Sequence, residues 1–192
     1  YIMKQVIIAL VPAALAGLFY FRLNALSAMF FCILGTVGSE HIFCKIMKKK
    51  STIGDFSAVV TGLLLAFNVP ASLPWWMCLL GGIFAMVVVK MVFGGIGCNF
   101  VNPALAARAF LLASFPVAMT AWTKTGVNFV SSANLDAVST ATPLSFLKAG
   151  PAGLADLAAN NISLSDMFLG NTGGCIGETC ALLVILGGVY LI

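Results

Sequence analysis

Charged residues are scarce in this chain, and their scarcity excludes most classes of soluble protein. Only 8% of its 192 residues are Asp, Glu, Lys or Arg, whereas a soluble globular domain carries roughly 25%. With 61% hydrophobic residues, the chain cannot cover an apolar core with a water-compatible surface. We therefore expect an integral membrane protein surrounded by membrane lipid. At a net charge of only +4, we expect no nucleic-acid partner.

The cysteines include no C-x-x-C pair, the commonest sequence sign of a metal or redox centre. We interpret them as small apolar residues that face lipid or other helices. We assign no metal ligand and no catalytic residue to this chain alone, and a cluster shared with another protein of a complex stays open as the alternative. The six are Cys32, Cys44, Cys78, Cys98, Cys175 and Cys180.

Apolar runs separated by short polar connections predict an all-α polytopic membrane protein. A full crossing requires roughly 20 residues, so the chain has room for five or six spans. The chain begins with Tyr1 and ends inside an apolar run, and we expect further protein on both sides, mainly after the C-terminus. The expected spans are 5–21, 25–47, a short segment 55–67, 75–93, 102–119 and the start of another at 178–192, with a tight connection at 22–24.

Positive charges predict the orientation of these spans, because cytoplasmic connections carry an excess of Lys and Arg. Residues 120–174, the one long polar region, then lie on the extracytoplasmic side, with short helices expected at 142–149 and 164–169. Three positive charges fall outside: Arg22, Lys124 and Lys148. Six fall inside: Lys4, Lys45, Lys48, Lys49, Lys50 and Lys90.

The sequence indicates two further helix starts, one at a short, interrupted segment and one at Asn102. Asp55 can cap an apolar run that is too short to cross a bilayer and ends at Asn68-Val69-Pro70. Such proline-interrupted segments often line binding sites, since irregular backbone is tolerated only where protein or water covers it. Asn102-Pro103 repeats the pattern of a cap followed by proline.

Ionisable residues within the spans are candidates for an ion path or an intramembrane polar site, because burying them in lipid is costly. Glu40 and His41 lie in the second span, and Arg108 lies in the fifth. The alternative places Glu40 and His41 near the cytoplasmic interface and pairs Arg108 structurally with a carboxylate or carbonyls. Glu178 opens the last span, where we interpret it as a structural residue that can cap the helix.

The polar stretch 136–143 ends in a helix start. Thr142 can be the N-cap and Pro143 suits the first helical position. Free N–H groups and the positive end of a helix favour an anion such as a phosphate there. Taken alone, this stretch predicts an ordinary cap in a turn rich in small and hydroxylic residues.

Longer motifs resemble the RnfD/NqrB family of flavin-carrying membrane subunits, found in the Rnf complex and in sodium-pumping NADH:quinone reductase. The matching runs are 55–68, 93–110 and 173–179, and the resemblance covers nearly the whole chain in order. The short N-terminal flank and the compact region 136–143 are more similar to RnfD than to NqrB. One departure is Thr140, where the family often has Gly; it adds bulk but leaves the acceptor position intact.

The resemblance implies that Thr142 carries FMN through a phosphoester bond installed by a flavin transferase. Asp136 and Ser139 would orient the loop or serve the transferase, and Thr140, Ala141 and Pro143 complete the site. Some members of the family also bind riboflavin inside the membrane.

The resemblance further implies one component of a ferredoxin:NAD⁺ oxidoreductase in a prokaryotic cell membrane, coupling electron transfer to Na⁺ or H⁺ export. Its partners would be the other Rnf proteins (A, B, C, E and G), with the flavin of the RnfG protein exchanging electrons with the FMN at the outer face. Family members have about ten spans in two inverted repeats, similar in fold to urea transporters. This chain would be the first repeat and the start of the second.

Two other functions compete with that of a redox carrier. A channel or small-solute transporter could use the half-helices near Asp55 and Asn102, and a shared fold cannot decide between the two. The flavin motif can, because a channel needs no acceptor threonine. An inert anchor for soluble redox proteins would keep the spans but make residues 136–142 dispensable.

Overall fold

The computed structural model describes residues 2–48, 52–122, 143–148, 164–170, 172–178 and 180–192. Within these ranges every regular element is a helix, and the single β contact is an isolated bridge between Pro70 and Cys175. The all-α prediction is therefore confirmed for the part of the chain that is described.

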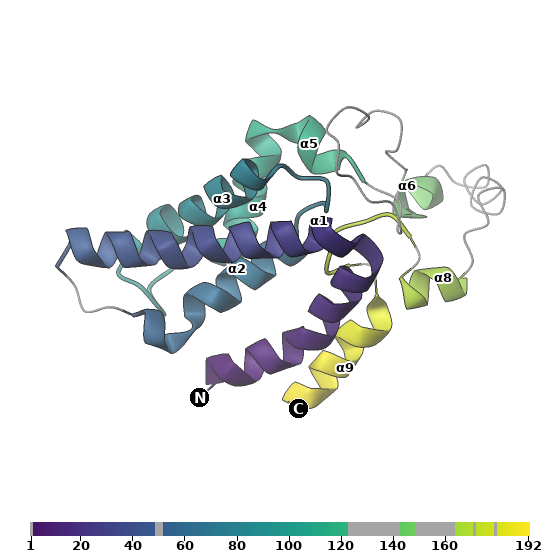
Figure 1. The fold of residues 1–192 in the computed structure, drawn as a ribbon, viewed down its shortest axis with the longest axis horizontal. Helices are drawn as coiled ribbons and strands as arrows, with labels where there is room; N and C mark the ends of the chain where they lie inside the picture. The colour runs from purple at the N-terminus through teal and green to yellow at the C-terminus, as the bar shows by residue number, and fades with distance from the viewer. Residues whose placement is uncertain (1, 49–51, 123–142, 149–163, 171, 179) are drawn as a thin grey trace.

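Helix α1 runs over Ile2–Ile46 and turns sharply at Arg22 (Figure 1). Arg22 has φ 50° and ψ −127°, which no helical residue adopts, so α1 consists of a first arm (residues 2–21) and a second arm (residues 23–46). This confirms the predicted connection at 22–24. Among the described residues, α1 is the one helix long and apolar enough to cross a membrane by length and composition.

The short segment begins differently from the prediction. Helix α2 covers Ser57–Phe67, and a single 3₁₀ turn, η1 (Ile53–Asp55), precedes it. Phe56 occupies the N-cap position with φ 62°, and no side chain caps the helix. The prediction that Asp55 is the cap is wrong because the left-handed Phe56 turns the chain before the helix starts.

The next two predicted spans are each divided. Helix α3 (Trp75–Phe84) continues into a π-helical stretch, η2 (Ala85–Met91). Helix α4 (Pro103–Ser114) begins as predicted, since the Asn102 side chain accepts hydrogen bonds from the N–H groups of Ala104 and Leu105. The expected span to residue 119 breaks at Phe115, and α5 (Pro116–Thr120) starts anew because Pro116 cannot continue the hydrogen-bond ladder.

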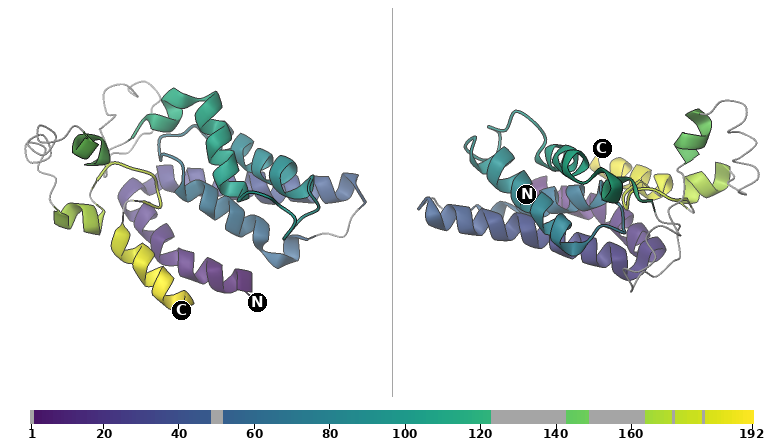
Figure 2. Two further views of the ribbon diagram at one scale, coloured as in Figure 1. Left: turned by 180° about the vertical axis from the view of Figure 1, so that it is seen from behind. Right: turned by 90° about the horizontal axis from the view of Figure 1, so that it is seen from above.

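Three shorter elements follow. Helices α6 (Pro143–Lys148) and α8 (Leu164–Leu169) agree with the two predicted helices of the polar region. Helix α9 (Ala181–Leu191) has Cys180 at its N-cap, so the prediction that Glu178 caps it is wrong. Helix α9 packs along the first arm of α1 (Figure 2). The Tyr190 hydroxyl lies 2.5 Å from Gln5 Oε1.

The elements meet at two opposite ends of a bundle. Residues 45–48 and 93–100 lie at one end, here named the lysine end, and the Arg22 turn lies at the other, the Arg22 end (Figure 1). Helices α6 and α8 also lie at the Arg22 end. Tyr20 donates a hydrogen bond of 2.7 Å to the Leu169 carbonyl and so holds α8 against the bundle.

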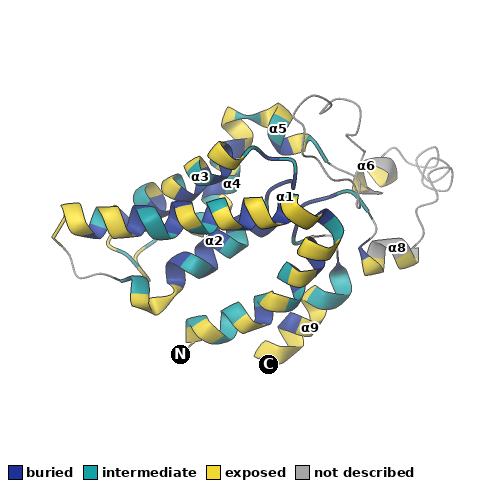
Figure 3. Cartoon of the chain, in the orientation of Figure 1, coloured by how far each residue is buried: buried dark blue, intermediate teal, exposed yellow. Residues whose placement is uncertain are grey.

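Glycines let the second arm of α1, α2 and α3 approach closely. A Cβ on Gly82 would lie 2.9 Å from the Cys32 carbonyl oxygen, and one on Gly62 would lie 2.8 Å from Ile33 Cα. Small residues at helix contacts are typical of bundles in lipid, where packing replaces the hydrophobic effect as the force between helices. The outer faces of the helices are exposed (Figure 3), and large apolar residues such as Phe19 and Phe30 lie there.

We expect Gly82→Ala to destabilise the bundle, because the atoms that its Cβ would meet belong to the backbone of α1 and cannot move aside. Overpacking of this kind costs roughly 1–3 kcal/mol. The matched control is Gly38→Ala on α1, where a Cβ would meet nothing within 4 Å. Thermal unfolding of the detergent-solubilised protein measures both, and equal midpoints for the two variants would contradict the close approach.

Candidate functional site

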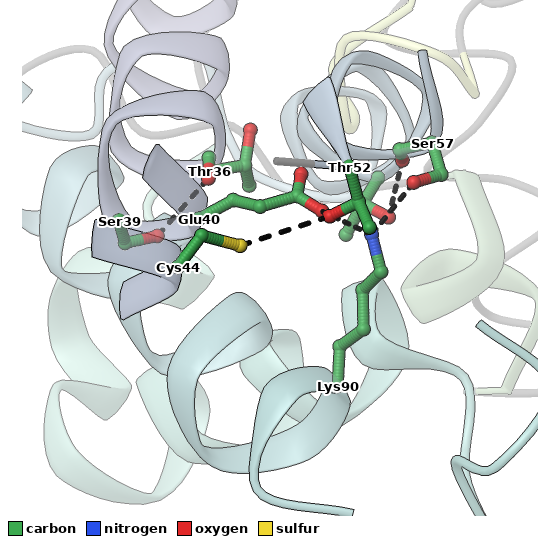
Figure 4. A network of polar contacts seen from close by, with 8 residues as sticks. Thr36, Ser39, Glu40, Cys44, Thr52, Ser57 and Lys90 are labelled. Carbon is green, nitrogen blue, oxygen red and sulfur yellow. Dashed lines mark hydrogen bonds and ion pairs between the residues drawn. The ribbon is translucent and has the colours of Figure 1, made fainter. Parts of the chain in front are cut away.

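A buried ion pair joins two segments far apart in the sequence. Lys90 Nζ lies 3.1 Å from Glu40 Oε1. Glu40 is fully buried, and Lys90 is only 3% exposed. Glu40 comes from the second arm of α1 and Lys90 from η2 (Figure 4). Each charge would be very costly to bury alone, so each requires the other.

Two hydroxyl groups complete this centre, which we name the Glu40 centre: Glu40, Lys90, Thr52 and Ser57. The Thr52 hydroxyl donates to Glu40 Oε1, and Lys90 Nζ donates to Ser57 Oγ over 2.6 Å (Figure 4). Thr52 precedes η1 and Ser57 opens α2, so four segments of the chain meet here. The Cys44 thiol lies beside the centre, 3.9 Å from Thr52 Oγ1.

The two oxygens of the Glu40 carboxylate differ in their hydrogen bonds. Oε1 accepts from both Lys90 and Thr52, whereas Oε2 is buried and has no hydrogen-bond partner among the described residues. A carboxylate normally accepts bonds at both oxygens, and a buried oxygen left unpaired carries a desolvation penalty. The centre therefore holds one open acceptor position in its interior.

The π-helical stretch η2 presents Lys90 to this centre. Its backbone bonds skip one residue further than in an α-helix, as in Val92 N–H to the Val87 carbonyl at 3.1 Å. The wider turn changes the direction of the side chains that follow. Single π turns inside α-helices occur frequently at functional sites.

Lys90 is a member of this centre that the sequence did not identify, and it no longer counts among the positive charges at the cytoplasmic surface. The sequence assigned it to the cytoplasmic surface, but the structure buries it against Glu40. The available signal was a lone lysine in an apolar run and a lone carboxylate in another, each needing a partner. His41 does not join the centre, because its side chain lies on the exposed face of α1.

Arg108 occupies a different position, at the C-terminal end of α2. Its Nη1 donates to Asn68 Oδ1 over 2.9 Å, and Asn68 is the C-cap of that helix. The Asn68 amide in turn donates to the Leu64 carbonyl over 2.8 Å. A cation at the carbonyl end of a helix is favoured by the helix dipole. This contact agrees with the structural alternative for Arg108.

The chain after α2 is tied to the segment before α9. Ile176 N–H donates to the Val69 carbonyl over 3.3 Å, and Gly177 N–H donates to the Phe67 carbonyl over 3.0 Å. A Cβ at position 177 would collide with Phe67, which explains the glycine. Two of the motif runs, 55–68 and 173–179, therefore meet in space and satisfy each other's backbone groups.

A pocket of about 430 Å³ lies beside this tie, between the first arm of α1, the C-terminal end of α2, α4 and α9. Arg108, Asn68, Cys175 and Glu178 supply its polar lining. Burial raises the pKa of the Cys175 thiol to about 12, and the nearby Arg108 guanidinium acts in the opposite direction. Cys175 therefore stays a thiol at neutral pH.

The predicted flavin site lies mostly outside the described residues. Asp136, Ser139, Thr140, Ala141 and Thr142 all fall there. Helix α6 begins at Pro143, the predicted first helical position. Among the residues that the structure describes, no three His, Cys, Asp or Glu side chains are grouped as a metal site would require, and the six cysteines are free.

Comparison with known proteins gives a match over the whole chain. The model of the NQR2, RnfD, RnfE family matches residues 1–192. The chain is 48% identical to the D subunit of the Na(+)-translocating ferredoxin:NAD(+) oxidoreductase complex of Acetobacterium woodii, covering 100% of this chain and 57% of the relative.

Two further relatives carry related names. Identity is 42% with the D subunit of the proton-translocating ferredoxin:NAD(+) oxidoreductase complex of Clostridium ljungdahlii, over 100% of this chain and 57% of the relative. It is 34% with the D subunit of the ion-translocating oxidoreductase complex of Halorhodospira halophila, over 100% of this chain and 59% of the relative. The chain thus spans somewhat more than half the length of the relatives it matches.

We expect a maleimide to label Cys98 and to spare Cys175 in the folded protein at pH 8. Cys98 is exposed, whereas Cys175 is 1% exposed and its raised pKa keeps it protonated. Only a thiolate reacts rapidly. Peptide mass spectrometry of the labelled protein measures both sites, with labelling in denaturant as the control. Labelling of Cys175 before unfolding would contradict the buried tie.

Proposed function

This chain belongs to the NQR2, RnfD, RnfE family, and we propose that it serves as the RnfD component of an ion-translocating ferredoxin:NAD⁺ oxidoreductase complex. Support comes from relatives named for that role that match the chain from end to end. Its partners are then the other Rnf proteins of the complex (A, B, C, E and G), in the cell membrane of a prokaryote.

The proposed cofactor is FMN, linked through its phosphate to Thr142. The observation that carries this proposal is the stretch 136–142 in a chain of this family, with Ser139 and Asp136 preceding the acceptor hydroxyl. A flavin transferase would install the group. When bound, the flavin supplies one- and two-electron redox chemistry, and this chain supplies position and surroundings.

Electrons would pass at the outer face. Helix α6 follows Thr142 directly and lies at the Arg22 end of the bundle, opposite the lysine end (Figure 1). Lysines beside spans favour the cytoplasmic side, so the Arg22 end is the proposed extracytoplasmic end. The flavin of the RnfG protein is the proposed exchange partner. A riboflavin inside the membrane is a second expectation from the family, with no site assigned.

The buried Glu40 centre is the proposed part of this chain in the ion path. It combines a carboxylate, two hydroxyl oxygens and a lysine within the bundle, near the lysine end. Buried ionisable groups in membrane segments commonly mark ion or proton pathways. Arg108 is given a structural role at the end of α2, and exposed His41 is left out of the path.

A channel or small-solute transporter remains the competing function, and the pocket beside Arg108 is the observation that favours it. Irregular backbone next to a cavity is the arrangement that transporters use at their substrate sites. A third function, an inert anchor, would leave both the acceptor threonine and the Glu40 centre without a task. The presence of covalent flavin would distinguish the redox function from the transporter and from the inert anchor.

We expect the wild-type chain to fluoresce under ultraviolet light after denaturing electrophoresis, and Thr142→Ala to abolish the signal, because the phosphoester survives denaturation and needs the hydroxyl. The matched control is Thr140→Gly in the same stretch, which should keep the fluorescence. A dark wild-type band, from cells that express the transferase, would refute the redox function.

A further inference from the structure

The open oxygen of Glu40 points to a ligand that the described residues do not supply. Lys90 and Thr52 both bind Oε1, while Oε2 is buried with no hydrogen-bond partner among the described residues. An acceptor in such a place is satisfied by a water molecule or by a cation that approaches that side. The inference that follows rests on the proposed ion-coupled function.

Charge balance decides between these two ligands and links the cation to Lys90. With Glu40 ionised and Lys90 protonated, the pair has no net charge. A second cation at Oε2 would leave an uncompensated positive charge in a fully buried centre, which is strongly unfavourable. A cation can therefore bind Glu40 only when the Lys90 ammonium withdraws.

The geometry gives Lys90 a route by which to withdraw. Lys90 is the last but one residue of η2, and the chain that follows is exposed at Phe93 and Phe100. A lysine has a long apolar stem that can lie along the helix while its ammonium reaches the interface. Its present second partner, Ser57, is neutral and offers only one hydrogen bond.

We propose that the Lys90 ammonium is a built-in competitor for a monovalent cation, a proton or Na⁺, at the Glu40 carboxylate. Lys90 fills the cation position in the conformation described here, and the incoming cation replaces it. Thr52 and Ser57 provide two hydroxyl oxygens beside the carboxylate for a dehydrated ion. The exchange keeps the centre neutral at every stage, so a cation cannot enter unless the Lys90 ammonium leaves.

Few other titratable groups can take part. Besides Glu40 and Lys90, the described segments that meet at the centre bring only Cys44, on the same arm of α1, to within hydrogen-bonding distance of one of its members. The hydroxyls of Thr52 and Ser57 do not titrate in the accessible range. A cation dependence at Glu40 is therefore set by Lys90.

The experiment measures the reaction of Glu40 with dicyclohexylcarbodiimide in membranes that hold the intact complex. This apolar reagent adds to protonated carboxyl groups in apolar surroundings, and mass spectrometry of the Glu40 peptide counts the adduct. The variants are Lys90→Met, which keeps the length of the side chain without its charge, and Glu40→Gln, which removes the reactive group. Lys45→Met, an exposed lysine on the same arm of α1, is the charge-matched control.

The expected result is slow labelling in the wild type, where the Lys90 ammonium occupies the carboxylate, and labelling at least about tenfold faster in Lys90→Met, where the buried carboxylate has lost its ion-pair partner. The rate in Lys90→Met should also rise as pH falls. If Na⁺ in place of choline slows that labelling at fixed pH, the cation is Na⁺; if only pH matters, it is a proton. Lys45→Met should behave as the wild type.

Three results would overturn the proposal. One is labelling of Lys90→Met at the wild-type rate, insensitive to pH and Na⁺, as expected for a buried water only. Another is that Lys90→Met fails to assemble while the charge-free double variant Glu40→Gln/Lys90→Met assembles. Glu40 would then lack a counter-charge in Lys90→Met, which means that no cation takes the place of the lysine. The third is failure of both, because a group that must move aside cannot be indispensable to the fold.

The outcome is distinguishable from failure of the proposed redox function. Ultraviolet fluorescence of the same chain on the same gel reports the flavin at Thr142 and does not depend on Glu40. A fluorescent band with unchanged labelling in Lys90→Met would retain the redox function and reject the competitor. A dark band with faster labelling would do the reverse.

Discussion

The ion pair between Glu40 and Lys90 is the interaction that most constrains this bundle. In a chain with 8% charged residues, it places two opposite charges where neither could stay alone. The pair brings η2 against the second arm of α1, and its hydroxyl partners bring in Thr52 and the start of α2. One pair therefore fixes the relative positions of segments that are 50 residues apart.

The same constraint, that polar groups inside an apolar bundle must find partners, explains the irregular parts of the fold. Helix α2 ends inside the structure, where the Asn68 amide donates to the Leu64 carbonyl and Gly177 N–H donates to the Phe67 carbonyl. Just beyond the helix, Ile176 N–H donates to the Val69 carbonyl, and Arg108 donates to the Asn68 side chain. The glycines serve a related need, because close approach of helices replaces the hydrophobic effect in lipid. The points at which helices end inside the bundle are thus stabilised by hydrogen bonds and close packing.

The proposed functions occupy opposite ends of this frame. The proposed attachment threonine precedes α6 at the Arg22 end, and Glu40 lies six residues before the end of α1 at the lysine end. Electron transfer at one end can influence a cation at the other only through an element with two arrangements. Under the proposed exchange, η2 is such an element, since its π turn carries Lys90 and borders the exposed turn that follows.

The sequence by itself determined the helical class, the turn at Arg22, the cap at Asn102 and the helix after Thr142, because each depends on composition or on a few adjacent residues. It also marked Glu40 and Arg108 as residues in need of partners. Only the tertiary structure decided which residues those partners are: Lys90 for Glu40 and Asn68 for Arg108. It also moved the starts of α2 and α9 away from Asp55 and Glu178. These outcomes depend on contacts between distant segments, and no local pattern records which buried charge a lysine will meet.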